Sequence, residues 1–320
     1  MRRYKKFLIQ IVIVTLIIFI AFGLLNLSLY KSEQSMLWIN NSLRIKENYA
    51  KSINENKIVF TAGSNVLFGI NTETIQKELK IPTVNMAVHA GLKADYIIYR
   101  TKKILKSGDL IIMPLEYHNF TWDGSFSEVK RDYLLTYDKD FFHTLPILSQ
   151  LKMLYSITPN MLLNSLYKQY FKKVKKSKIG ENYNSDTLNK HGDETYKKGS
   201  KNKVLTKNYK AFKIDKFYKT QGLKSINQFA KWCKKNNINF YISFPNTINL
   251  KDYHTEKYKI YFQNLIHYFK KNNIDFIGKP TDSLYPKEYF YDSNYHLNLY
   301  GSQIRTKKII ELIKRTVKYK

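Results

Sequence analysis

Three polar residues have the chemistry that a serine-based acyl transfer needs, although they lie far apart in the sequence. Ser64 follows a short apolar run and comes directly after Gly63, whose lack of a side chain permits a tight turn. Asp292 and His296 lie four residues apart, just before the final helical segment. A serine hydroxyl is a poor nucleophile until a base takes its proton, and an imidazole held by a carboxylate is such a base. Taken singly, Ser64 is explained better as a helix cap, and His296 as a polar loop residue.

Other polar residues follow the neighbouring apolar runs. Gly91 comes after the second run, and its backbone N–H is placed to join that of Ser64 in an oxyanion hole. A glycine that merely ends a strand accounts for Gly91 equally well. Glu116 and His118 follow the third run, either as site residues or as solvated polar groups. The remaining candidates for lining the site are Asn65, Asn85 and Asn298.

These residues share one edge only if the segments around them form a parallel sheet, and the sequence predicts that fold. Short β-branched runs alternate with segments of helical spacing, which is typical of βαβ units whose helices cover both faces of the sheet. The predicted strands are 57–63, 83–88, 109–115, 238–244 and 274–277, and the predicted helices are 71–79, 94–105, 216–235, 256–271 and 299–317. Ligands of such sheets bind at the carboxyl ends of the strands, where Ser64 and Gly91 stand.

The alternation is interrupted between residues 119 and 215, which we interpret as an insertion. Segments 141–155 and 161–171 are rich in aromatic residues and have helical spacing, and a polar tract follows them. Residues 165–210 contain thirteen lysines against four acidic residues. This excess predicts a docking surface for anionic lipid headgroups or an anionic wall polymer, with solvated lysines as the alternative.

The N-terminus predicts a membrane anchor. Four basic residues in segment 1–6 precede an apolar run, 7–29, whose 23 residues cover about 35 Å as a helix, enough for a hydrocarbon core of about 30 Å. A cleaved signal peptide has a shorter apolar stretch and a cleavage site of small residues, which this run lacks, and a buried core helix is the other alternative. The positive-inside rule places residues 1–6 in the cytoplasm. Residues 30–56 then form a connector or first helix, and residues 57–320 form an extracytoplasmic domain.

Composition excludes several classes of protein. The chain has 320 residues and a formal net charge of +29, but its 26 Tyr, 19 Phe and 3 Trp supply enough aromatic surface for a core, which excludes wholesale disorder. Its single cysteine excludes a disulfide framework and a thiolate metal cluster. The charge alone is compatible with nucleic acid, but an extracytoplasmic location excludes that partner. The proposed chemistry requires no metal and no organic cofactor.

Together these residues resemble the SGNH/GDSL hydrolase superfamily of serine esterases and acyltransferases. The resemblance is to its membrane-anchored, extracytoplasmic branch, which includes alginate O-acetylation proteins and the teichoic-acid D-alanylation protein. It covers residues 57–118 and 216–317 and leaves the insertion unmatched. It implies a flavodoxin-like, three-layer α/β fold in which Ser64 is the nucleophile and Gly91 donates to the oxyanion hole. It also implies that His296 is the base and that Asp292 orients it.

Two positions depart from the family pattern. Asp292 and His296 are four residues apart instead of three. The asparagine that the family uses after its third strand has no counterpart, because Glu116 or His118 stands there. The resemblance implies a serine esterase or O-acyltransferase acting on a cell-surface polysaccharide or wall polymer. The alternative is a non-catalytic domain that partners a membrane O-acyltransferase or binds an anionic polymer.

Overall fold

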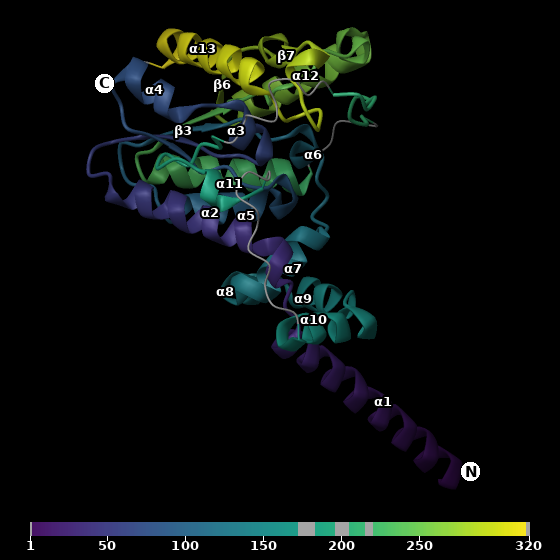
Figure 1. The fold of residues 1–320 in the computed structure, drawn as a ribbon. Helices are drawn as coiled ribbons and strands as arrows, with labels where there is room; N and C mark the ends of the chain where they lie inside the picture. The colour runs from purple at the N-terminus through teal and green to yellow at the C-terminus, as the bar shows by residue number, and fades with distance from the viewer. Residues whose placement is uncertain (1, 172–182, 196–204, 215–219, 318–320) are drawn as a thin grey trace. The chain divides into compact units, whose positions relative to one another are not determined.

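The computed structural model describes residues 2–171, 183–195, 205–214 and 220–317 (Figure 1). The chain forms two compact units. The smaller unit comprises residues 1–37 and 126–176, and the larger one comprises residues 38–125 and 177–320. The division separates the first part of the predicted insertion, which joins the N-terminal helix, from its second part, which joins the sheet.

The larger unit is built on a five-stranded parallel sheet. Its strands are β1 (Ile58–Phe60), β2 (Thr83–Asn85), β3 (Leu110–Met113), β4 (Asn239–Ser243) and β6 (Asp275–Ile277), in the spatial order β2-β1-β3-β4-β6. Val59 of β1 is in register with Val84 and Ile111 on its two neighbours. The first three strands are buried along their whole length, as expected where helices cover both faces. The predicted α/β class with a parallel sheet is therefore confirmed, and each of these strands lies within a predicted run.

Helices lie on both faces of this sheet (Figure 1). On one face α5 packs with α11, and on the other α13 packs with α3 and α4. The α-helices described in this unit are most of α2 (Glu33–Ser52), α3 (Ser64–Gly69), α4 (Thr72–Leu79), α5 (Lys93–Lys102), α6 (Tyr117–Phe120), α11 (Gln221–Lys235), α12 (Glu256–Lys271) and α13 (Leu299–Thr316). A second sheet pairs the short strands β5 (Thr247–Ile248) and β7 (Leu284–Tyr285), which lie outside the predicted runs.

A buried ion pair joins the starts of β1 and β3. The Nζ of Lys57 lies 2.7 Å from Oδ2 of Asp109, and both side chains are almost completely buried. The same carboxylate accepts the backbone N–H groups of Lys57 and Lys106, at 3.1 and 2.9 Å. Asp109 therefore satisfies three donors, and the two from Lys57 are buried.

Part of the predicted insertion packs against the sheet unit. The carboxylate of Asp193 accepts hydrogen bonds from the hydroxyl of Thr72, at 2.8 Å, and from the side-chain amide of Asn85, at 3.1 Å. The ammonium of Lys46 donates to the carbonyl oxygens of Asn85 and Gly192, at 2.9 and 2.5 Å. Segment 183–195 is thus held to β2 and α4. Residues 172–182 and 196–204, which carry most of the predicted lysine-rich surface, lie outside the described residues.

Lys46 should make the stability of the protein depend on pH. Burial lowers the pKa of Lys46 from 10.5 to about 7. Between these two values the unfolded chain binds a proton that the folded protein has released. The free energy of unfolding should therefore rise with pH across this window, by at most about 1.4 kcal/mol per pH unit. Below the lower value both states are protonated, and the cost of the buried charge is complete and constant.

The measurement compares the full chain in detergent with its Lys46→Met variant by denaturant titration. We expect the stability of the wild type relative to the variant to increase between pH 7 and pH 10, following the shifted pKa of Lys46. Subtracting the variant removes the contribution of the many buried tyrosines. A constant difference over this range would show that Lys46 stays charged when buried.

The smaller unit contains α1 (Arg2–Leu29), the first residues of α2 (Glu33–Ser52), and four helices from the first part of the predicted insertion. Those four are α7 (Glu128–Tyr137), α8 (Lys139–Thr144), α9 (Ile147–Tyr155) and α10 (Pro159–Phe171). The predicted helical segment 141–155 is broken at Pro146, because proline has no N–H and forces Leu145 into an extended conformation. The predicted connector 30–56 consists mostly of α2.

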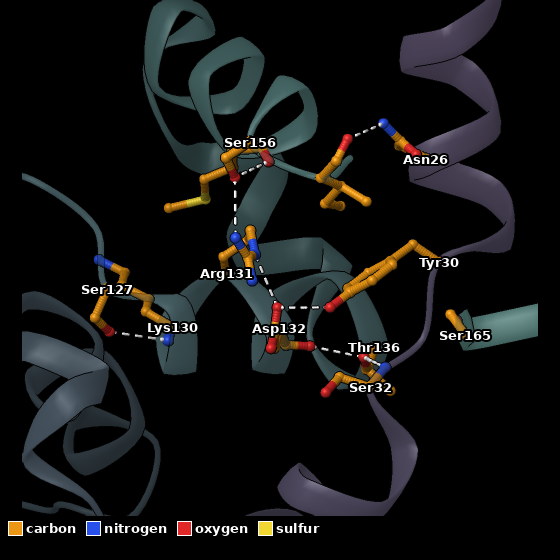
Figure 2. Close-up of polar contacts among 12 residues, drawn as sticks. Asn26, Tyr30, Ser32, Ser127, Lys130, Arg131, Asp132, Thr136, Ser156 and Ser165 are labelled. Carbon is orange, nitrogen blue, oxygen red and sulfur yellow. Dashed lines mark hydrogen bonds and ion pairs between the residues drawn. The ribbon is translucent and has the colours of Figure 1, made fainter. Parts of the chain in front are cut away.

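The predicted apolar helix is present. Residues 3–29 of α1 form a helix that is long and apolar enough to cross a bilayer, with 6% of its apolar window buried. A signal sequence meets the same criteria of length and composition. Asn26 near the end of α1 contacts α9, and Tyr30, the residue after α1, contacts Asp132 of α7 (Figure 2). The N–H of Lys31 donates to the hydroxyl of Ser165 on α10.

Candidate active site

Ser64 stands at the carboxyl end of β1, where the strand turns into α3. Gly63 is the N-cap of α3, and Ser64 is its first residue. The apolar run that precedes Gly63 forms β1, an interior and fully buried strand, so the turn follows a rigid element. Ser64 is partly exposed, whereas its neighbour Asn65 is fully buried and donates its side-chain amide to the carbonyl of Pro114.

The structure brings Ser64, His296 and Asp292 together. Nε2 of His296 lies 2.8 Å from Oγ of Ser64, and Nδ1 of His296 lies 2.7 Å from Oδ1 of Asp292. An ionised carboxylate only accepts hydrogen bonds, so Nδ1 carries the proton and Nε2 is left to accept the serine O–H. The imidazole is 7% exposed and the carboxylate is 33% exposed. This is the geometry of a hydroxyl whose proton can pass to a base that a carboxylate orients.

The loop around His296 is held by its own backbone. The N–H of Tyr291 donates to the carbonyl of His296 at 3.2 Å, and the side chain of Asn298 accepts the N–H of Gly301 at 2.9 Å. Asn298 is thereby the N-cap of α13 and also donates to the carbonyl of Glu288. The spacing of four residues between Asp292 and His296 fits within this loop without separating the two side chains.

Aromatic rings surround the imidazole. The ring centroid of Phe68 lies 4.5 Å from that of His296, and the ring centroid of Tyr291 lies 6.1 Å from it. The hydroxyl of Tyr183 lies 3.4 Å from Nδ1 of His296, and its ring packs against Trp38 at 5.1 Å. Burial raises the pKa of Tyr183 and of Tyr291, so both hydroxyls stay protonated at neutral pH.

Tyr183 was missed by the sequence analysis. It comes from segment 183–195, more than one hundred residues from His296 along the chain. Its φ of 63° is uncommon for a residue other than glycine. No local pattern marks it, because its position depends on the docking of a segment that resembles a polar insertion.

Glu116 lies directly beneath the serine turn. Its side chain accepts the backbone N–H of Gly63 at 3.2 Å and that of Asn65 at 3.0 Å, so it bonds the residues on both sides of Ser64. The residue is 1% exposed. Two backbone donors that face away from solvent are thus satisfied by one carboxylate, which fixes the turn that carries the hydroxyl.

Gly91 lies in the loop that touches the same turn, but its N–H is engaged elsewhere. It donates to Nδ1 of His89 at 2.9 Å. Burial lowers the pKa of His89 to about 4, so its ring is neutral at physiological pH and can accept this bond. Burial also lowers the pKa of His118, which follows Glu116. Asn85, a predicted lining residue, donates its side-chain amide to Asp193 of segment 183–195 and accepts the backbone N–H of Ala87.

Replacing Gly63 with alanine should disrupt this turn. An added Cβ would lie 2.4 Å from Cβ of Ala90, 2.5 Å from its Cα and 2.5 Å from Oε1 of Glu116, all closer than carbon contacts allow. The crowding should cost about 1–3 kcal/mol of stability, measured by denaturant titration. Ser64→Ala, one position later and partly exposed, is the matched control and should unfold like the wild type. Equal stability of Gly63→Ala and the wild type would show that the turn is not tightly packed.

Among the described residues, no group of three or more His, Cys, Asp or Glu side chains is arranged to hold a metal ion. Cys233 is buried, and burial raises the pKa of its thiol to about 12. The side chains that cluster around Ser64 are instead a hydroxyl, an imidazole and a carboxylate.

No protein-family model matches the chain, and no curated protein matches it. One similar solved structure, from Streptococcus pneumonia, is described as a platelet activating factor. It is 12% identical, with a TM-score of 0.36, and the match covers 87% of this chain and 94% of that one. A TM-score this low does not establish a common fold.

Proposed function

We propose that the chain is a membrane-anchored, extracytoplasmic serine esterase or O-acyltransferase of the SGNH type. Its substrate would be an ester on a cell-surface polysaccharide or wall polymer. The observation that carries this proposal is the hydrogen-bonded chain from Ser64 through His296 to Asp292, with distances of 2.8 and 2.7 Å. The strand order β2-β1-β3-β4-β6 supports the flavodoxin-like fold, since it corresponds to the order 2-1-3-4-5 of such sheets.

The geometry supports an acyl-enzyme mechanism. Oγ of Ser64 attacks the ester carbonyl while its proton passes to Nε2 of His296, and Asp292 stabilises the resulting imidazolium. The C–O bond to the leaving alcohol then breaks, and the alkoxide takes the proton from Nε2. Water, or a hydroxyl of an acceptor glycan, attacks the acyl-serine in the second half-reaction, with His296 again taking the proton. The bond between the acyl carbon and Oγ then breaks, and Oγ of Ser64 recovers the proton from Nε2 of His296. Water gives hydrolysis, and a glycan hydroxyl gives transfer.

The negative charge that develops on the carbonyl oxygen needs donors. The N–H groups of Ser64 and Gly91 are the proposed ones, and the loop of Gly91 lies against the serine turn through Ala90 and Gly63. The N–H of Gly91 donates to His89, so it would serve the oxyanion by exchanging that bond for a charge-assisted one.

The proposed location rests on α1. The basic residues before the apolar run favour a cytoplasmic N-terminus. Retention of the helix is supported by Asn26, which is fully buried and donates to the backbone of α9. Cleavage after the apolar run would remove these contacts from the smaller unit. An extracytoplasmic location makes nucleic acid an unsuitable partner.

One observation favours the alternative of a non-catalytic partner domain. Glu116 accepts the N–H groups on both sides of Ser64, and the negative charge of its carboxylate would oppose an oxyanion nearby. A domain of this kind would bind a membrane O-acyltransferase or an anionic polymer without turning over an ester.

The two functions are separated by supplying the full chain, in detergent, with a soluble acetyl ester and a polysaccharide acceptor. An esterase releases free acetate, a transferase gives acetylated polysaccharide, and both products should be absent from a His296→Ala sample. If the folded wild type forms neither product with any ester tested, the non-catalytic role is the better account.

A further inference from the structure

The smaller unit exposes two apolar stripes beside the end of α1. On α9 and α10, seven large apolar residues are between 38% and 77% exposed. They are Ile147, Leu148, Leu151, Leu163, Tyr167, Tyr170 and Phe171. The spacing within each helix places its members on one face. Segment 147–171 contains no acidic residue and two lysines. A patch of this kind on a water-facing surface would be a liability, so it marks a surface that something apolar covers.

Polar bonds tie α9 to the apolar helix at a buried asparagine. The side-chain amide of Asn26, which Figure 2 labels, donates to the carbonyl oxygens of Leu154, at 2.9 Å, and of Ile157, at 3.4 Å. Leu154 lies in the last turn of α9, and its carbonyl also accepts the backbone N–H of Ile157, which is two residues beyond the end of the helix. The buried side-chain amide of Asn26 therefore finds its acceptors at the end of α9, as a buried polar group requires.

A second contact lies deeper along α1. The hydroxyl of Tyr155 donates to the carbonyl of Phe19 at 2.8 Å, and the two rings stack with centroids 3.8 Å apart. Gly23 permits this approach, because a Cβ there would lie 2.6 Å from the hydroxyl oxygen of Tyr155. Phe19 is ten residues before the end of α1, which corresponds to about 15 Å along the helix axis. The end of α9 is thus fastened well within the apolar run.

Side chains from α8 and α10 donate hydrogen bonds to the carbonyl oxygens in the last turn of α1. The carbonyl of Leu27 accepts from the ammonium of Lys139 at 2.6 Å, and that of Leu29 accepts from the side chain of Gln169 at 3.0 Å. The hydroxyl of Ser165, on α10, bonds both the N–H and the carbonyl of Lys31. Side chains of α8 and α10 therefore bond the backbone at the end of α1 and just after it.

We propose that α9 and α10 form a membrane-interface platform, whose exposed apolar faces rest in the bilayer leaflet at the C-terminal end of α1. A hydrocarbon core of about 30 Å that begins beside Lys6 ends, at 1.5 Å per residue, near Asn26. Tyr155 and Phe19 then lie inside the hydrocarbon, and the stripes of α9 and α10 lie at its boundary.

The occupant of the platform is lipid and not another protein because the stripes continue the exposed surface of α1. The residues of α1 from Phe7 to Ile20 that are large and apolar are mostly about half exposed, so they also require lipid. Tyr167 and Tyr170 are of the type that gathers at the membrane interface, and Lys152 and Lys168 suit its headgroups. The platform would give the chain a second hold on the bilayer, at a fixed depth along α1.

The test uses spin labels on the full chain reconstituted in vesicles of phosphatidylcholine and phosphatidylglycerol. Single cysteines replace Leu148 and Leu163 on the platform, and Gln228 and Lys231, which are exposed on α11 of the larger unit, serve as matched exposed positions outside the platform. Val14→Cys, on α1, reports whether the anchor itself is inserted. The native Cys233 is buried and should not be labelled. The readout is the accessibility of each label to oxygen, which enters lipid, relative to a water-soluble nickel complex.

We expect this ratio to be several-fold higher at Leu148→Cys and Leu163→Cys than at the two matched positions. A high ratio at Val14→Cys with nickel-accessible labels on the platform would mean that the stripes face water, which overturns the proposal while the anchor stands. Platform labels that neither reagent reaches would mean that a protein covers them, which also overturns it. None of these outcomes depends on esterase activity.

Discussion

Replacing Ser64 with alanine is expected to abolish turnover of an acyl ester, with a loss of about 10⁴-fold or more in kcat. The reason is that its hydroxyl is the group hydrogen-bonded to Nε2 of His296, at 2.8 Å, and alanine leaves the imidazole with no proton to take. The measurement is the rate of acetate release by the full chain in detergent. His296→Ala should cost about as much, and the double variant should cost little more, because the two groups act as one unit.

A matched serine controls for the loss of a hydroxyl. Ser125 lies in the same unit and is exposed, and its backbone bonds the side chains of Asp123 and Trp122. Ser125→Ala should keep the wild-type rate. Wild-type turnover by Ser64→Ala would mean that any esterase activity resides elsewhere in the preparation.

Asp109→Ala should produce the largest loss of stability among substitutions away from the site. It would leave the ammonium of Lys57 buried without its partner at 2.7 Å, together with two backbone donors. Breaking a buried pair from one side costs about 3–5 kcal/mol, a large share of the roughly 5–15 kcal/mol that stabilises a typical domain. Denaturant titration of the full chain should show this loss.

The control for Asp109 is an aspartate of the same sheet that faces solvent. Asp275, at the start of β6, is exposed, and its replacement by alanine should change the stability by less than about 0.5 kcal/mol. Similar small effects at both positions would mean that the Lys57–Asp109 pair contributes no net stabilisation in this fold.

The sheet, and the grouping of Ser64, His296 and Asp292, could be predicted because their sequence signals are local. Each strand is a short apolar run, and the edge at which Ser64 lies follows from the way parallel strands end. Asp292 and His296 lie four residues apart within one loop, so their short separation in the sequence predicts that they can contact each other. The remaining step, from that loop to Ser64, followed from the position of the loop immediately before the last helix.

The parts that could not be predicted depend on contacts between distant segments. Tyr183 reaches His296 only because Asp193 and Lys46 hold segment 183–195 to the sheet. Glu116 was expected among the site-lining residues, but its bonds to the two N–H groups that flank Ser64 depend on the exact turn at Gly63. Periodicity cannot reveal such bonds, because it reports which face of an element is buried and not what meets it.

The packing of the smaller unit could not be predicted for the same reason, because it depends on contacts between distant segments. Helices α7 to α10 were expected within an insertion remote from the N-terminus, whereas α9 and α10 pack on α1 through Asn26 and Tyr155. A single asparagine in an apolar run carries no signal for its partner. The lysine-rich docking surface, which was predicted from the excess of positive charge, stays a prediction, because much of that tract lies outside the described residues.

The most direct test of an activated Ser64 is labelling of the full chain with a fluorophosphonate probe, followed by mass spectrometry of its peptides. The account predicts one phosphonylated residue, Ser64, with labelling lost in Ser64→Ala and strongly reduced in His296→Ala. Absence of labelling in the folded wild type, or labelling that persists unchanged in Ser64→Ala, would contradict it.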